Sequence, residues 1–149
     1  MPVSNFTADD VLTAANMNLL PRGVMAYAQV TADQTGISTV TDLTSLTTTF
    51  TAVASRRYRI TGHVLVRKLT NTGDVAVTVA NSANVQQATC QVSLVGADSE
   101  THTLVVHFIV VPGAGSITYK LRLATSLGTC NLLAGAVFPA FILVEDIGV

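Results

Sequence analysis

Apolar and polar side chains alternate with a period of two along most of the chain after residue 23. The alternation is cleanest over residues 57–68. The apolar set there is Tyr58, Ile60, Gly62, Val64 and Val66, and the polar set is Arg57, Arg59, Thr61, His63 and Arg67. Successive side chains of a β-strand leave opposite faces of its sheet, so this period predicts strands with one buried and one exposed face. The pattern therefore predicts an all-β domain over residues 23–149.

Turn-forming residues divide this region at short intervals, for example at 33–36, 71–74 and 112–115. The strands expected between the turns are 24–31, 38–42, 46–52, 57–68, 75–81, 86–95, 101–111, 116–124, 129–133 and 137–145. Strands of this length with frequent turns are typical of an antiparallel β-sandwich or jelly roll. Only 11% of the residues are charged, so uncharged polar groups, mainly Thr, must cover much of the surface.

The first 22 residues follow a different pattern and are expected to form an N-terminal arm. Thr7 is a good helix cap and is followed by Asp9 and Asp10, which favour the first turn of a helix. Thr13 offers a second cap, and Pro21 ends any helix. A helix this short is marginal in water, so we expect the arm to become ordered only by packing on its own domain or on another protein.

Two late segments, 101–111 and 138–144, are apolar on both faces. A sandwich strand normally buries one face and exposes the other. Either a loop covers the second face or another subunit does, and the shortage of charge favours a subunit contact in a closed, symmetric oligomer. The expected interface residues are Val105, Ile109, Val111, Phe138, Phe141 and Leu143.

Charge and hydropathy bear on other partners. The formal net charge is −1, and the one basic group, Arg56, Arg57 and Arg59 with Arg67 and Lys68 further along, is better explained as a solvated strand face or a subunit contact than as a nucleic-acid site. No stretch reaches the roughly 18 apolar residues of a spanning helix, so we expect no membrane insertion. The sequence predicts neither a nucleic-acid partner nor a membrane partner.

Catalytic, cofactor and metal motifs are not found in the sequence. His102 and His107 are an odd number of positions apart on one expected strand, so they leave opposite faces. Most carboxylates occupy turns or the arm. Cys90 and Cys130 fit no metal or redox motif, although a disulfide between them stays open. The absence of Trp and the 5% aromatic content weaken a sugar-binding role, because such sites usually stack a ring. We expect a protein without catalytic residues, cofactor or metal.

Two stretches resemble short structural proteins of bacteriophages. Residues 6–18, FTADDVLTAANMN, are similar to the opening F-T-x-x-x-V-L-T-A-x-x-M/L-N of many such proteins from tail and head-associated genes. Residues 139–148, PAFILVEDIG, are similar to the C-terminus of such proteins in phages of actinobacteria. With the region 24–51, the resemblance covers most of the chain and implies a protein of the phage particle.

A second resemblance concerns the fold. Residues 50–52 followed by 58–60 are similar to the Phe…Gly-x-Tyr spacing of trimeric jelly rolls of the C1q and tumour-necrosis-factor (TNF) type, and 141–143 match their last apolar strand. Arg56 stands where those families keep Gly. The resemblance implies a homotrimer with apolar inner strands at the three-fold axis.

These resemblances imply a non-enzymatic protein of the virion, assembled in the host cytoplasm. The favoured expectation is a trimeric capsid decoration protein that stabilises the head and binds the phage major capsid protein through its arm. The residues expected to anchor the arm on the particle are Phe6, Val11, Leu12, Met17, Leu19 and Leu20. The alternative is a minor tail or fibre-tip protein that assembles with tail components and binds the host surface. A glycan-binding module or an unrecognised enzyme stays a more distant alternative.

Overall fold

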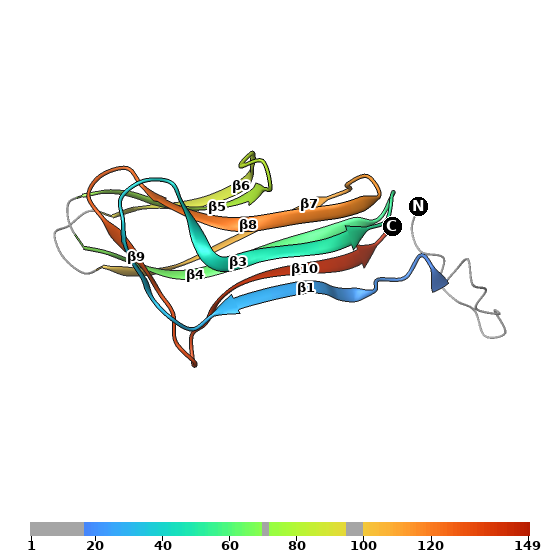
Figure 1. Cartoon of the computed structure of the whole chain (residues 1–149), viewed down its shortest axis with the longest axis horizontal. Coiled ribbons are helices and arrows are strands. Elements are labelled where there is room, and N and C mark those ends of the chain that lie inside the picture. The colour runs from blue at the N-terminus through green and yellow to red at the C-terminus, as the bar shows by residue number, and fades with distance from the viewer. Residues whose placement is uncertain (1–16, 70–71, 95–99) are drawn as a thin grey trace.

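Strand β4 (Arg57–Lys68) lies in the middle of the larger of two antiparallel sheets, and its burial alternates as the sequence predicts. The computed structural model describes residues 17–69, 72–94 and 100–149 (Figure 1). The other strands are β1 (Gly23–Val30), β2 (Gln34–Ile37), β3 (Thr41–Ala52), β5 (Gly73–Asn81), β6 (Gln86–Leu94), β7 (Thr101–Val110), β8 (Gly115–Thr125), β9 (Cys130–Leu133) and β10 (Ala140–Gly148). The expected all-β antiparallel sandwich is confirmed.

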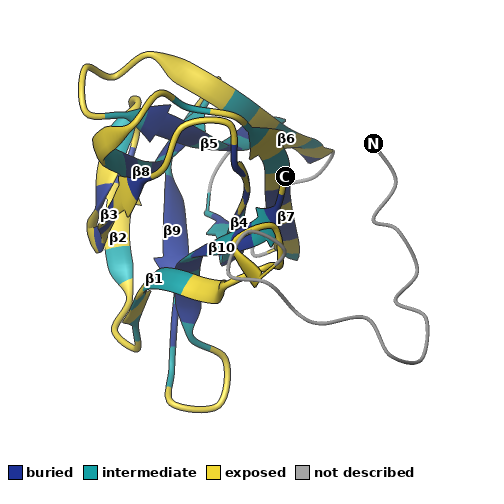
Figure 2. Cartoon of the chain, turned by 90° about the vertical axis from the view of Figure 1, so that its right-hand side faces the viewer, coloured by how far each residue is buried: buried dark blue, intermediate teal, exposed yellow. Residues whose placement is uncertain are grey.

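The larger sheet has the order β1-β10-β4-β9-β2, and β7 pairs with the other side of β4. The smaller sheet has the order β3-β8-β5-β6. The sheets close on each other along two sides, where β1 lies beside β3 and β6 lies beside β7 (Figure 2). All pairings between named strands are antiparallel.

The core fills the space between the sheets with the inward side chains of both. Its largest fully buried members include Tyr58, Ile60, Leu121, Leu123 and Ile142. The sheets are in close contact at Gly62, where a Cβ atom would lie 2.5 Å from Cδ2 of Leu121. Gly62 therefore serves packing between the sheets, because no side chain fits there without displacing Leu121.

The start of the domain differs from the expected strands. Instead of 38–42, β2 occupies Gln34–Ile37 and overlaps the expected turn 33–36, while residues 41 and 42 begin β3. Gly36 has a φ of 73°, and its N–H donates to Asn131 Oδ1 at 2.9 Å. The turn-forming glycine thus makes an irregular strand on β9, and Val40 is left 56% exposed in the connection that follows.

The last strand also differs. It runs Ala140–Gly148 rather than 137–145, because Gly135 and Phe138 first exchange backbone hydrogen bonds of 3.1 and 3.3 Å in a tight turn and Pro139 has no N–H to donate. Ahead of the domain, residues 17–20 form a turn in which Leu20 N–H donates to Met17 carbonyl at 3.2 Å. The rest of the expected arm, with Phe6, Val11 and Leu12, lies outside the described residues.

Candidate functional sites

The outer face of the larger sheet carries large apolar side chains on β1, β10 and β7, and we call it the apolar face, although the outward positions of β4 between them are mainly polar. Its exposed members are Val24, Tyr27, Val105 and Ile109, which are 63, 50, 45 and 59% exposed. The half-buried members are Leu143, Phe141 and His63. Strand register brings these side chains together, since His63 pairs with Phe141 on one side and with Val105 on the other.

Three rings lie in line on this face. The ring of Phe141 lies 5.1 Å from the His63 ring at an interplanar angle of 12° and 5.9 Å from the Tyr27 ring. His63 Nδ1 is buried and has no hydrogen-bond partner among the described residues. A buried polar atom without a partner is costly, so a partner from outside this chain or water would stabilise it.

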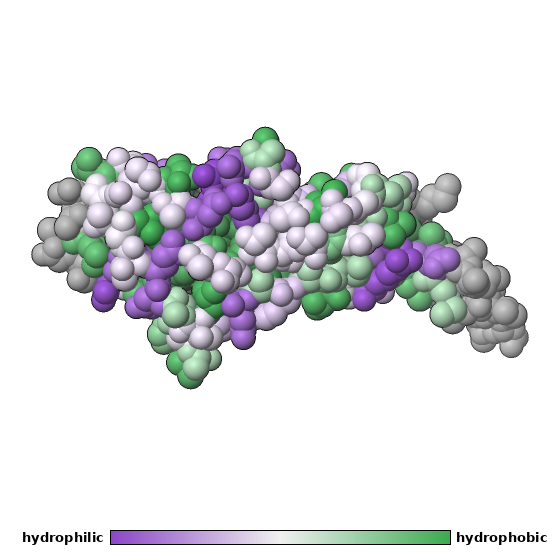
Figure 3. All heavy atoms as spheres, viewed as in Figure 1, coloured by the Kyte–Doolittle hydropathy of each residue, from purple (hydrophilic) through white to green (hydrophobic). Residues whose placement is uncertain are grey.

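The predicted interface residues fall into two groups. Val105, Ile109, Phe141 and Leu143 share the apolar face, as expected from the alternation. Val111 lies just beyond β7, and Phe138 lies in the β9–β10 turn beside Val137, which is 89% exposed. This turn protrudes from the sandwich with a partly apolar tip (Figure 3). The tip of this turn forms a second exposed apolar feature, in addition to the apolar face.

The outer face of the smaller sheet is mainly polar. Threonine pairs bridge its strands, with Oγ1–Oγ1 distances of 2.7 Å for Thr49–Thr118 and for Thr78–Thr89. Figure 3 shows a pale, weakly polar surface over much of β3 and β8. The outward positions of this sheet are thus suited to water, whereas the larger sheet also exposes large apolar side chains such as Val105 and Ile109.

One charge cluster lies on the smaller sheet. Asp42 accepts hydrogen bonds from Lys120 Nζ at 2.5 Å and from Arg122 Nε at 2.7 Å. The hydrogen bond from Lys120 is the main reason that the pKa of Asp42 lies below its ordinary value, and Arg122 adds to it. Both bases share this single carboxylate, so the cluster carries a small net positive charge.

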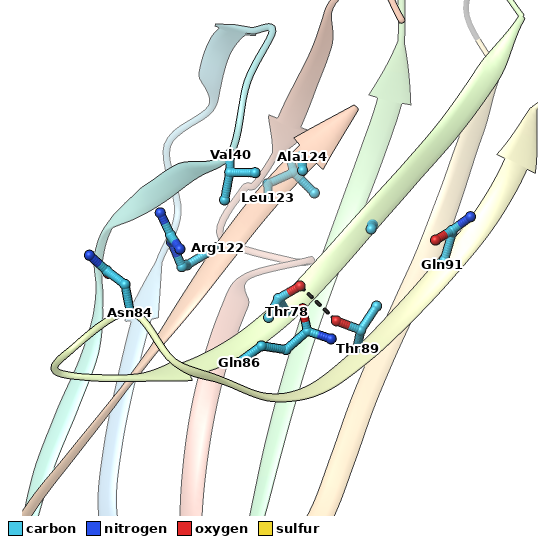
Figure 4. Close-up of a pocket in the computed structure, with 10 residues that line it drawn as sticks. Val40, Thr78, Asn84, Gln86, Thr89, Gln91, Arg122, Leu123 and Ala124 are labelled. Atoms are coloured by element: carbon cyan, nitrogen blue, oxygen red, sulfur yellow. Dashed lines mark hydrogen bonds between the residues drawn. The ribbon is translucent and has the colours of Figure 1, made fainter. Parts of the chain in front are cut away.

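A hollow of about 380 Å³ lies next to this cluster (Figure 4). Its floor is formed by Ala76 and Ala124, which are paired in register between β5 and β8. Amide side chains of β6 and of the turn before it line one side, and Val40 lines the other. The hollow exists because two small side chains are neighbours on a face that otherwise carries larger ones.

The end of the domain nearest the arm contains a buried ion pair. Arg56 and Asp146 are 2% and 1% exposed, with Nε–Oδ2 at 2.5 Å and Nη2–Oδ1 at 2.8 Å. The same guanidinium donates to the carbonyls of Asn18 and Leu20, the latter at 2.6 Å. Asp146 also accepts from Gly148 N–H at 2.9 Å. Arg56 thus ties the last turn of the arm to the last strand, and we call these contacts the arm anchor.

The arm anchor holds its charges in place. Burial alone raises the pKa of Asp146, but the hydrogen bonds from Arg56 and from Gly148 N–H outweigh it, and the pKa lies below the ordinary value of 3.8. The hydrogen bond to Asp146 raises the pKa of Arg56. Sequence reasoning placed Arg56 on a solvated face or a subunit contact, which is wrong because Asp146 and the arm cover it. The departure from the Gly of the C1q and TNF pattern marked position 56 but did not indicate its role.

The sequence predicted the surroundings of Lys68 and of the two cysteines only in part. Lys68, expected on a solvated face, is 3% exposed and donates to Thr125 Oγ1 at 2.7 Å and to Leu127 carbonyl at 2.6 Å. Cys90 and Cys130 are free thiols on different sheets, and burial raises the pKa of Cys130. Within 17–69, 72–94 and 100–149, no cluster of three or more His, Cys, Asp or Glu side chains could hold a metal ion.

Among these same ranges, no helix has the length and apolar character needed to cross a membrane.

Comparison with solved structures relates this fold to a known one. The fold is similar to that of the Eiger TNF from S. frugiperda, with a TM-score of 0.57, 85% of this chain covered and 93% of the other. The two sequences are 9% identical, so the likeness concerns the fold alone. No family model and no curated protein matches the sequence. The domain is therefore a TNF-like jelly roll, as its sequence pattern predicts.

Proposed function

We propose that this protein is a non-enzymatic structural component of a bacteriophage particle and that it works as a homotrimer. The observation that carries the trimer is the apolar face, where Val105 and Ile109 lie exposed beside half-buried Phe141 and Leu143. Exposed apolar clusters rimmed by polar groups mark protein contacts. The Arg59–Glu145 ion pair, with N–O distances of 2.8 and 2.9 Å, lies within this face, because Arg59 pairs in register with Ile109 and Glu145 with Val24.

The fold supports this stoichiometry. Trimeric jelly rolls of the C1q and TNF type place apolar strands at a three-fold axis, and this chain has the TNF-like fold with an apolar outer face. A closed ring of three copies covers the face in every subunit, whereas an open arrangement would leave it exposed at the ends of a fibre. Water or a neighbouring copy would then satisfy His63 Nδ1.

Within the particle, we assign the protein to the capsid surface as a decoration protein. The arm carries the phage-like opening motif, and its described end exposes Met17, Leu19 and Leu20 at 59, 48 and 37%. The arm anchor fixes where this segment leaves the domain. Three arms held at one end of a trimer, laid on the major capsid protein, would stabilise the shell by burying apolar surface at many sites.

A minor tail or fibre-tip role is the alternative. It is favoured by the hollow on the polar outer face, because that face stays free of the proposed trimer contact and is open to a ligand. In that role the arm would attach to tail components instead of the shell.

The trimer is tested by Ile109→Asp, because a charge placed on a buried interface is expensive. Sedimentation equilibrium should show a trimer for the wild type and a monomer for the variant. Thr49→Asp is the matched control, since Thr49 occupies an exposed outer position on the other sheet. A wild-type monomer, or a trimer that survives Ile109→Asp, would contradict the assignment.

The location on the particle needs a separate experiment. Deleting residues 1–16 should abolish binding to particles that lack the protein and leave a folded trimer, because the arm anchor begins at Asn18. Electron microscopy of particles carrying gold-labelled protein then decides between the two roles. Label on the head supports decoration, and label on the tail supports the alternative.

A further inference from the structure

The hollow on the smaller sheet has a fixed shape. Asn81 pins the turn between β5 and β6, because its Oδ1 accepts from the N–H groups of Ala83 and Val85 at 3.0 and 2.9 Å. This turn holds Asn84 at a φ of 65°, in the left-handed region. Below it, the Thr78–Thr89 hydroxyl pair joins the two strands. The backbone of the rim is thus held in place before any ligand arrives, whereas the exposed side chains of Asn84, Gln86 and Gln91 must be ordered on binding.

The rim presents amide groups that the protein itself does not use. Asn84, Gln86 and Gln91 line the hollow, and their side-chain amides have no hydrogen-bond partner among the described residues. Each amide offers two donor hydrogens and an acceptor oxygen. In Figure 4 these side chains surround the Thr78–Thr89 pair, with Gln86 and Gln91 along β6 and Asn84 at the turn. A ligand that both donates and accepts at several points would match them.

Charge narrows the ligand further. Arg122 lines the hollow, but its Nε is bound to Asp42 at 2.7 Å. No carboxylate lines the hollow. The carboxylate of Asp42 therefore neutralises part of the charge of Arg122, and the hollow offers no anion for a basic ligand, while the methyl groups of Ala76 and Ala124 form a small apolar floor.

From these features we infer that the hollow binds a neutral saccharide. Sugar hydroxyl groups donate and accept like the amides of the rim, and the C–H face of one sugar ring fits the alanine floor. No aromatic side chain lines the hollow, so hydrogen bonds must supply most of the affinity and a single site is weak. This inference does not depend on the location of the protein on a particle. In a trimer, three weak sites would bind a repeating glycan together.

The test uses the full-length, isotope-labelled protein and two-dimensional ¹⁵N–¹H NMR. The probes are neutral oligosaccharides of glucose, galactose, rhamnose and N-acetylglucosamine, added to concentrations well above the millimolar range, with inorganic phosphate as the charged comparison. At least one saccharide should shift the amide signals of Ala76, Asn84, Gln91 and Ala124 in a saturable way, and phosphate should not. Shifts with none of the saccharides, shifts confined to another surface, or an equal response to phosphate would overturn the inference.

Three variants locate the site. Gln91→Ala removes one amide and should weaken binding about fivefold, the effect of one lost hydrogen bond. Ala76→Val fills the floor from an outward position of β5 and should weaken binding at least about tenfold. Gln87→Ala is the matched control from the same strand, because Gln87 donates to the carbonyls of Val85 and Gln86 and lines a different hollow. The same spectra report whether each variant is folded, and equal affinity in all three variants would contradict the site.

Discussion

The two sheets bury the same kind of side chain on their inner faces and differ on their outer faces. The larger sheet exposes several large apolar side chains there, and the smaller sheet is mainly polar. Inner positions hold residues such as Ile60 on the larger sheet and Val77 on the smaller one, both fully buried. Outward positions of the larger sheet include exposed Val105 and Ile109 beside the mainly polar residues of β4, whereas those of the smaller sheet are mainly Thr, Ser, Gln and paired charges. Because the inner phase only builds the core, the outer phase reports what each sheet meets beyond the domain. The proposed trimer contact accounts for the apolar residues on one side of the sandwich, and the proposed saccharide site lies on the other.

The largest effect is expected when exposed apolar residues at the larger sheet are replaced with Thr, a residue that the smaller sheet carries on its outer face. Replacing Val105, Ile109 and Val111 together with Thr changes exposed positions only, so the domain should fold as before. Without its apolar contacts the trimer should dissociate, and sedimentation equilibrium should show a monomer with an unchanged far-ultraviolet circular dichroism spectrum.

The reverse exchange is the control. Thr47, Thr49 and Thr51 are exposed outer positions of β3, and changing them to Val should leave the trimer intact. New apolar surface on the outside of a closed ring should instead cause association beyond the trimer at high concentration. If the first variant stays trimeric, the comparison between the faces loses its meaning for assembly.

The second largest effect compares one carboxylate from each sheet. Asp146→Asn leaves the buried Arg56 guanidinium without its counter-charge and should cost about 3–5 kcal/mol of unfolding free energy. Asp42→Asn removes an exposed partner of Lys120 and Arg122 and should cost about 1 kcal/mol or less. Chemical denaturation of both variants measures the difference. Equal losses would mean that the arm anchor adds nothing beyond a surface ion pair.

The acid behaviour of the same two variants gives an independent check. The folded pKa of Asp146 lies below its ordinary value of 3.8, so its stabilising effect is complete well above that pH and is lost as the pH falls through the folded pKa. The wild type should therefore lose stability below about pH 4, and Asp146→Asn should lose less over that range. Proteolysis of the arm should rise in parallel, because Arg56 also holds the carbonyls of Asn18 and Leu20.

The sequence predicts strands in which apolar and polar residues alternate regularly. It does not predict contacts that depend on which strands pair and in what register. The bounds of β4 were predicted correctly because one unbroken apolar phase runs through 57–68. Gln34–Ile37 was missed as a strand because turn-forming residues there pair irregularly with β9. The arm anchor joins residues 90 positions apart, and the hollow needs Ala76 beside Ala124, so neither has a local signal. The exposed apolar residues of β7 were predicted because the apolar character of this strand is visible on both of its faces.

A smaller effect is expected where the two sheets touch. Gly62→Ala places a Cβ atom 2.5 Å from Leu121 Cδ2 and 3.1 Å from Val106 Cγ1, and neither neighbour can move into solvent. Overpacking of this kind should cost about 1–3 kcal/mol. Adding Leu121→Val should restore part of that loss, because it shortens the side chain that clashes. A double variant less stable than the sum of the two single losses would place the strain elsewhere.

The smallest effect concerns a polar side chain that lies on an inner face, among the core residues. Thr48 lies on the inner face of β3 at 5% exposure, and its hydroxyl has no hydrogen-bond partner among the described residues. Thr48→Val keeps the shape and removes the unsatisfied hydroxyl, so it should stabilise the fold by about 1 kcal/mol. Thr49→Val is the neighbouring control on the outer face, where the hydroxyl bonds to Thr118, and should change stability by less than about 0.5 kcal/mol. Urea unfolding in the monomeric triple-Thr background measures both without any contribution from trimer dissociation. A loss of stability in Thr48→Val would mean that a buried water satisfies this hydroxyl, and the inner face of β3 would then be less dry than its neighbours.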